Sequence, residues 1–145
     1  MIKYASFRGR LFFCSNMYPC NIDYKGIVYP SAENAYQAYK STDVKIHENF
    51  ALLLPMEAKK AGQNLLIRSD WDKIKLSVMK EILKMKFSNA DLAKMLLATG
   101  DEVLIEVNYW GDRFWGESPR GIGLNHLGNL LMEIRSELNA STITG

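Results

Sequence analysis

The chain has 145 residues, of which 48% are hydrophobic and 23% are charged, and its net charge is +2. These proportions are typical of an ordinary globular protein, so we expect a single domain over residues 1–145. They exclude a disordered or fibrous chain, and no extended basic tract announces a nucleic-acid footprint. No apolar run is long enough to span a bilayer and no apolar signal segment opens the chain, so a cytoplasmic protein without membrane partners is expected.

Cysteine and histidine are scarce in this chain. Cys14 and Cys20 are the only cysteines, and His47 and His126 are the only histidines. Two cysteines do not make a disulfide framework, and no Cys/His spacing resembles a zinc site. We therefore expect reduced thiols, no bound metal and no cofactor.

The first half of the chain predicts a hairpin followed by helices. Residues 22–24 and 27–29 flank Lys25-Gly26, which suits a two-residue hairpin turn. Ser31 is a suitable N-cap for a helix that runs to Lys40. Further helices are predicted over 44–53 and from Pro55 to Gly62 or slightly beyond, because proline suits a first helical position.

The second half predicts three more helices and one strand. Asp70 is a candidate cap for a long helix with apolar residues at helical spacing, and Ser88 for the next, which stops near Gly100. Residues 103–107 predict a strand, residues 108–124 a loop, and residues 124–138 a last amphipathic helix. The sum is an α+β fold, predominantly helical with a few short strands, and not a doubly wound parallel sheet.

The helix after Ser31 carries an unusual set of polar residues on one face. Glu33, Tyr36, Gln37 and Lys40 lie three, four and seven residues apart and so share one side. We expect that side to be buried, since the opposite one is not more apolar. An acid, an amide and an amine are costly to bury unless they pair or act on a ligand, which favours a polar site.

A second segment, residues 108–128, is rich in glycine and aromatic residues. Five glycines and two tryptophans fall within it. Glycine lets a backbone approach a ligand, aromatic faces stack on heterocycles, and a helix N-terminus binds phosphate. Arg113 or Arg120 would add a fork-shaped contact to that phosphate.

Each of these residues also has a simpler interpretation. Glu33 can be a first-turn carboxylate that is favoured by the helix dipole, and Lys40 can be an ordinary lysine exposed to water. Asp112 can be a turn residue whose side chain bonds the nearby backbone. A loop of glycines and aromatics is often a tight turn with a hydrophobic plug. Gly121-x-Gly123 is not a dinucleotide fingerprint, because the third glycine and the strand–turn–helix context are missing.

Four motifs in order resemble one known family. The segment Tyr29-Pro30-Ser31-x-Glu33-x-x-Tyr36-Gln37-Ala38-x-Lys40 resembles the YPTxEHxxQAxKF signature of the NADAR family. Ser15-Asn16 resembles its SNF motif, and Asn108 through Gly116, with Asp112-x-Phe114-Trp115-Gly116, resembles its N..D.[FY]WG motif. The segment from Gly121 to Arg135 resembles its GxGxNxLGxLLMxxR motif. The chain departs from the signature at Asn34, where the family usually has His, and at Ala35, Ser41 and Cys14, beside the polar face, where a change of substrate choice is expected.

The resemblance implies hydrolysis of an N-glycosidic bond between a phosphorylated ribose and a base. The implied substrates are ribosylamino-pyrimidine phosphates of riboflavin synthesis, or ADP-ribose joined to guanine. Glu33, Lys40 and Asp112 are the expected catalytic residues. Glu33 would assist at the anomeric carbon, and Lys40 would act as nucleophile or proton donor. The expected substrate-binding residues are Ser15, Asn16, Tyr36, Gln37, Trp110, Arg113, Phe114, Trp115, Gly121, Gly123 and Asn125.

Two alternatives stay open on the sequence. One is a non-catalytic module that binds NAD or ADP-ribose. The Glu33–Lys40 pair favours the enzyme, because a domain that only binds the ligand does not need a reactive amine. The other is action on ADP-ribosylated nucleic acid. The modest net charge leans toward small molecules, since backbone binding usually takes several added cations. The glycosidase interpretation depends on the prediction that Glu33, Lys40 and Trp115 meet in one ribose-sized cleft.

Overall fold

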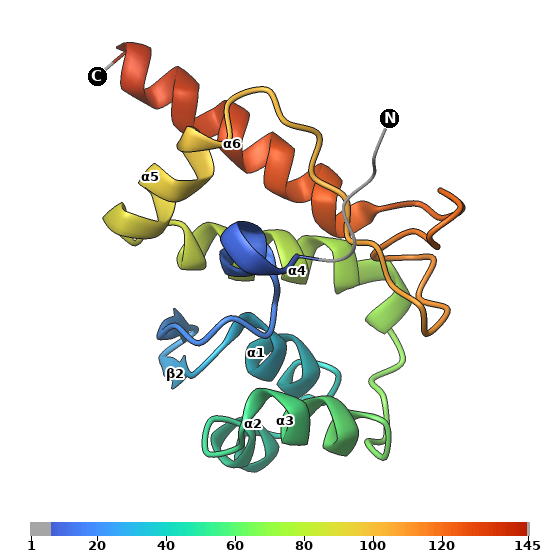
Figure 1. The fold of residues 1–145 in the computed structure, drawn as a ribbon. Helices are drawn as coiled ribbons and strands as arrows, with labels where there is room; N and C mark the ends of the chain where they lie inside the picture. Colours follow the sequence, from blue (N-terminus) through green and yellow to red (C-terminus); the bar gives the residue numbers. More distant parts are fainter. Residues whose placement is uncertain (1–6, 145) are drawn as a thin grey trace. The chain divides into compact units, whose positions relative to one another are not determined.

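The computed structural model describes residues 7–144, which divide into two compact units. We call Asn16–Ser88 the central unit, and the residues up to Ser15 together with those from Asn89 the terminal unit. The described residues form six α-helices, one 3-10 helix and one two-stranded sheet (Figure 1). The predicted α+β class, dominated by helices, is confirmed. One domain over residues 1–145 stays a prediction.

The central unit opens with the predicted hairpin. Strand β1 (Ile22–Tyr24) pairs antiparallel with β2 (Ile27–Tyr29). Lys25 and Gly26 between them have φ of 52° and 90°. Positive φ at both central residues is what a tight hairpin turn of matching twist requires.

Helix α1 (Ala32–Ala38) is surrounded by the other elements of the central unit. It contacts both strands and the helices α2 (Val44–Phe50), α3 (Pro55–Gly62) and α4 (Trp71–Lys86). All seven of its residues are buried. The polar face is therefore buried as predicted, but so is the opposite face, and the helix ends two residues before Lys40.

Two predicted helix caps differ from those observed. Asp70 is at the N-cap position of α4, but its carboxylate accepts hydrogen bonds from the Arg68 guanidinium instead of capping the helix. Helix α5 (Ala90–Ala98) is capped by Asn89 and not by Ser88. Asn89 Oδ1 accepts from the amides of Asp91 and Leu92, whereas the Ser88 hydroxyl donates to the Met85 carbonyl.

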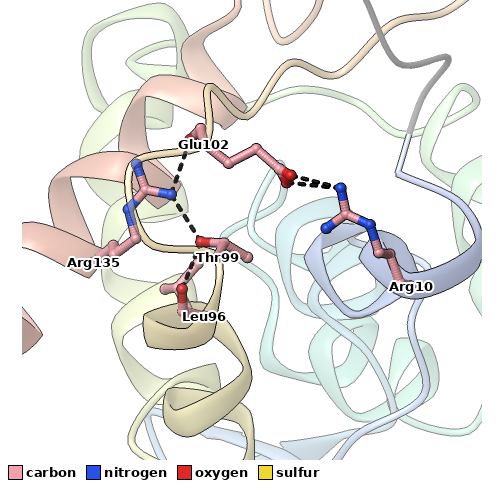
Figure 2. Close-up of polar contacts among 5 residues, drawn as sticks. All are labelled: Arg10, Leu96, Thr99, Glu102 and Arg135. Carbon is pink, nitrogen blue, oxygen red and sulfur yellow. Dashed lines mark hydrogen bonds and ion pairs between the residues drawn. The ribbon is translucent and has the colours of Figure 1, made fainter.

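The terminal unit joins η1 (Gly9–Cys14), α5 and α6 (His126–Thr144). Figure 2 shows the polar contacts that tie them together. Arg135 on α6 donates to Thr99 Oγ1 at 2.8 Å and to the Glu102 carbonyl at 2.9 Å. The Glu102 carboxylate pairs with Arg10 of η1 at 2.5 and 2.9 Å. Arg135, the last residue of the family motif, thus ties α6 to the segment that follows α5.

The predicted strand over residues 103–107 is wrong. Within the described residues, only a single bridge between Val107 and Glu117 involves this segment. The Asn125 side chain takes the place of a partner strand, because its Oδ1 accepts from the Glu106 amide and its Nδ2 donates to the Leu104 carbonyl, both at 3.0 Å. The last helix begins at His126, two residues later than predicted.

No helix among the described residues combines the length and the apolar content that a membrane span requires.

Candidate functional site

Local capping places Glu33 at the start of α1. The Ser31 side chain accepts from the Asn34 amide at 3.2 Å, as predicted for an N-cap. The Glu33 amide donates to the Asn16 carbonyl at 2.9 Å, and the Glu33 side chain is 8% exposed. A carboxylate in the first turn of a helix is favoured by the helix dipole, which offsets part of the desolvation cost of this acid.

Gln37 lies one helical turn after Glu33 and is bonded to it. Its Nε2 donates to Glu33 Oε2 at 2.7 Å, a contact buried from water. Its Oε1 rests against Gly62 of α3, where an added Cβ would stand 1.9 Å from that oxygen. Both ends of the Gln37 amide thus face the protein, although the sequence suggested a substrate contact.

Lys40 lies just beyond α1 and is half-buried. Its backbone carbonyl accepts from the Arg68 amide at 2.7 Å, which fixes the chain at this point. Burial lowers the pKa of the Lys40 amine, and the charge of Lys75 lowers it further, while the negative charge of Glu33 acts in the opposite direction. A desolvated amine near a carboxylate has the properties of a nucleophile or of a proton donor.

Aromatic rings line the same part of the central unit. The Lys40 amine lies 5.7 Å from the centre of the Tyr36 ring, which in turn lies 5.2 Å from the Trp71 ring. Tyr36 and Trp71 are both buried. Trp71 is absent from the sequence-based set of site residues, because it is twenty or more residues away from any motif and only the fold brings it to Tyr36.

Asn16 holds an acceptor that the described residues leave unused. Its Nδ2 faces the Met79 sulfur at 3.6 Å, a weak acceptor, and its Oδ1 is buried without a hydrogen-bond partner in this part of the chain. Buried polar atoms are almost always paired. An unsatisfied amide oxygen on the residue whose carbonyl holds the Glu33 amide suits a ligand contact.

In the terminal unit, Asp112 builds a closed loop. Its Oδ1 accepts from the amides of Phe114 at 3.1 Å and Trp115 at 2.9 Å. Asn108, which is buried, grips the Asp112 backbone with both ends of its side-chain amide, at 2.8 and 3.1 Å. This matches the simpler interpretation of Asp112 as a turn residue, and its catalytic role stays a prediction.

The loop presents its aromatic side chains in two ways. Phe114 and Trp115 are half-buried and form an edge-on pair with ring centres 4.8 Å apart, and the His126 ring lies 4.5 Å from that of Phe114. Trp110 is 58% exposed, and Arg113 is exposed as well. The half-buried pair therefore packs within the loop, whereas Trp110 and Arg113 are more exposed to solvent.

The glycines of this segment mainly let backbones approach one another. A Cβ on Gly123 would lie 2.2 Å from the Gly116 carbonyl oxygen, and one on Gly128 would lie 2.1 Å from the Leu104 carbonyl oxygen. Gly121 has φ of 82°, which also favours glycine. The side-chain amide of Asn125 is hydrogen-bonded to the backbone of Leu104 and Glu106, as described above. Direct contact of Gly121, Gly123 and Asn125 with substrate stays a prediction.

The predicted site residues fall into two groups. The central unit brings together Asn16, Glu33, Tyr36, Gln37 and Lys40. The terminal unit brings together the loop residues that the sequence singled out, while Ser15 ends its helix η1 with its amide bonded to the Phe12 carbonyl at 2.9 Å. The meeting of both groups in one cleft stays a prediction. Asn108, which closes the loop, is the first residue of the motif that contains Asp112, but it was not among the expected site residues.

Comparison with known proteins identifies the family. The pattern described as the NADAR domain matches residues 6–139, so this chain belongs to the NADAR family, as predicted. It is 40% identical over 135 residues to a riboflavin biosynthesis protein of Vibrio vulnificus, covering 87% of this chain and 35% of that longer protein. An N-glycosidase of Nostoc punctiforme is 38% identical, with 90% of this chain and 88% of that protein covered. The NMR structure of YbiA from Escherichia coli superposes with a TM-score of 0.85 and 32% identity, covering 98% of this chain and 86% of that one.

Proposed function

We propose that this protein is an N-glycosidase that hydrolyses the bond between a phosphorylated ribose and a base. The observation that carries the proposal is a buried acid, Glu33, in the first turn of α1 and a desolvated amine, Lys40, just beyond its end, close enough for the charge of Glu33 to raise the pKa of the amine. Membership of a family that includes proteins named N-glycosidase supports it.

The chemistry asks for two complementary groups. As the C1′–N bond breaks, positive charge develops on the sugar and electrons move to the leaving nitrogen. Glu33 stabilises the sugar cation and takes a proton from the attacking water. Lys40 either gives a proton to the leaving nitrogen, or attacks C1′ as the neutral amine after the sugar ring has opened. In the second case the C1′–N bond to the base breaks, the base leaves with a proton, and water later cleaves the imine between C1′ and Lys40. General acid–base help of this kind contributes roughly 10²–10⁴-fold to a rate.

The remaining residues would bind and orient the substrate. Trp110 is exposed and suits stacking on the leaving base, together with Trp115. The unpaired Oδ1 of Asn16 suits a ribose hydroxyl. Asp112 holds Trp115 in place through the loop and would position water with its carboxylate. The other proposed contacts are those of Ser15, Tyr36, Arg113, Phe114, Gly121, Gly123 and Asn125.

The first candidate substrate is a ribosylamino-pyrimidine phosphate of riboflavin synthesis, because two similar proteins are named for that pathway. The second is ADP-ribose joined to guanine, free or in nucleic acid, as the family resemblance implies. Both are phosphorylated intracellular molecules. Together with the two free thiols, Cys14 and Cys20, this supports a cytoplasmic location.

The test is incubation with each candidate substrate and measurement of the released base by chromatography. We expect turnover of at least one, and a loss of roughly 10²–10⁴-fold in Glu33→Gln and in Lys40→Met. Asp112→Asn keeps an acceptor oxygen for the amides of Phe114 and Trp115 but removes the negative charge, so a loss of activity in this variant would come from the chemistry and not from the loop. Binding of ADP-ribose without turnover of either substrate would leave the binding module as the function.

A further inference from the structure

The strongest unexplained feature of the central unit is the position of the Gln37 side chain between Glu33 and α3. Gln37 is 6% exposed, its Nε2 is bonded to Glu33, and its Oε1 is buried with no hydrogen-bond partner among the described residues. Substrate contact would not explain this arrangement, because one end of the amide faces the acid and the other faces α3.

Gly62 creates the space that the amide occupies. A Cβ at this position would lie 1.9 Å from Gln37 Oε1 and 2.7 Å from Gln37 Cδ. Gly62 lies within α3 and does not have the positive φ that would itself require glycine. Glycine in a helix is about 1 kcal/mol less favourable than alanine. Alanine would therefore make α3 itself more stable, and the space needed by the Gln37 side chain explains why residue 62 is glycine.

A glutamine has a property that a charged partner lacks. When the Glu33 carboxylate is ionised it only accepts hydrogen bonds, and it accepts one from Gln37 Nε2. When it is protonated it donates, and rotation of the Gln37 side-chain amide by half a turn brings Oε1 into place as the acceptor. Either state leaves one end of the amide bonded and the other end facing Gly62. Lysine or arginine would bond the ionised form alone.

We propose that Gln37, seated by Gly62, is a positioning residue that holds the Glu33 carboxyl group in one place in both of its protonation states. The inference rests on the proposed function, in which Glu33 takes up a proton and releases it in each turnover. It assigns to Gln37 a role through Glu33 and removes it from the residues that bind substrate.

The kinetic test uses Gln37→Met and Gly62→Ala, with a ribosylamino-pyrimidine phosphate and an ADP-ribosylated guanine nucleotide as probes. Misplacement of a reacting group by about 1 Å can lower a rate by about 10²-fold. We expect both variants to lose about 10–100-fold in kcat, with KM within about twofold of the unmodified protein. Gln63→Met is the matched control, because Gln63 follows Gly62 directly and is exposed; it should keep both parameters. A raised KM with unchanged kcat would show that Gln37 binds substrate, and wild-type kinetics in both variants would equally overturn the proposal.

A second measurement needs no turnover and no variant. In the unmodified protein, NMR follows the side-chain NH₂ group of Gln37 and the carboxyl carbon of Glu33 while the pH is varied. We expect the two signals to move with one midpoint, while the NH₂ group of Gln63 stays unchanged. A Gln37 signal that does not move as Glu33 titrates would refute the positioning role. If neither probe is hydrolysed but the two signals move together, the N-glycosidase proposal fails while the coupling stands.

Discussion

Replacing Asn34 by leucine should unfold the central unit much more readily. Asn34 is fully buried, and its Nδ2 donates to the carbonyls of Phe50 at 2.8 Å and Leu53 at 2.9 Å. These carbonyls lie at and just beyond the end of α2, where helical carbonyls lack a partner within the helix. Leucine would leave the Leu53 carbonyl without this donor and would remove the acceptor of the Ser31 hydroxyl, whereas the Phe50 carbonyl would keep the Leu53 amide at 3.3 Å. At about 1–3 kcal/mol for each of these two groups, the loss amounts to about 2–6 kcal/mol.

Urea unfolding monitored by tryptophan fluorescence measures this loss as a lower midpoint with an unchanged slope. Asn64→Leu is the matched control, because Asn64 is exposed, and it should change stability by less than about 0.5 kcal/mol. Asn34→His, the residue usual in the family, can keep one of the two donated bonds and should fall between the two. A loss below about 1 kcal/mol in Asn34→Leu would refute the reasoning. The Asn34 side chain is engaged with the end of α2, and an effect of the change from His to Asn on substrate choice stays a prediction.

Three further predictions concern charged side chains. Arg135→Met removes the donors to Thr99 and to the Glu102 carbonyl, and should lower the free energy of unfolding by about 2–3 kcal/mol in the same urea assay. The Arg10 guanidinium holds the pKa of the Glu102 carboxyl below its usual value, so this pair stabilises the fold above about pH 4.3 and stops doing so as the pH falls through the lowered pKa. The difference in unfolding free energy between the unmodified protein and Arg10→Met should therefore be present at neutral pH and vanish in acid. A difference that stays constant with pH would contradict this prediction. Because burial lowers the pKa of Lys40, its amine should be methylated first on mild reductive methylation near pH 8, as read by peptide mass mapping, and an earlier reaction at exposed lysines would contradict this.

The parts of the fold that the sequence predicted correctly depend on neighbouring residues. The Lys25-Gly26 turn needs only two residues with positive φ, and the N-cap Ser31 needs only the amide three residues later. Pro55 likewise begins α3 because of its own ring. Such signals act within a few residues, so they can be recognised without knowledge of the tertiary structure.

The incorrect predictions depend on competition that the local sequence does not reveal. Asp70 satisfied every local rule for a cap, but the guanidinium of Arg68 binds its carboxylate more strongly than a helix amide would. Residues 103–107 have the apolar content of a strand but lie beside the side chain of Asn125, some twenty residues later. Sequence can identify an extended segment; which atoms satisfy its backbone depends on the tertiary fold.

The same distinction sorts the family motifs into scaffold and chemistry. Asn108, Asn125 and Arg135 use side-chain polar atoms on the protein's own backbone, and Gly128 lets two backbones meet. These contacts give each of the four residues a role in the fold that does not require a ligand. Glu33 cannot be explained so simply, because an acid placed away from water lowers stability unless its charge is used. A stability measurement therefore separates the two classes: scaffold variants should lose stability, whereas Glu33→Gln should retain or gain it while activity falls. Parallel loss of stability and activity in Glu33→Gln would place the acid with the scaffold instead.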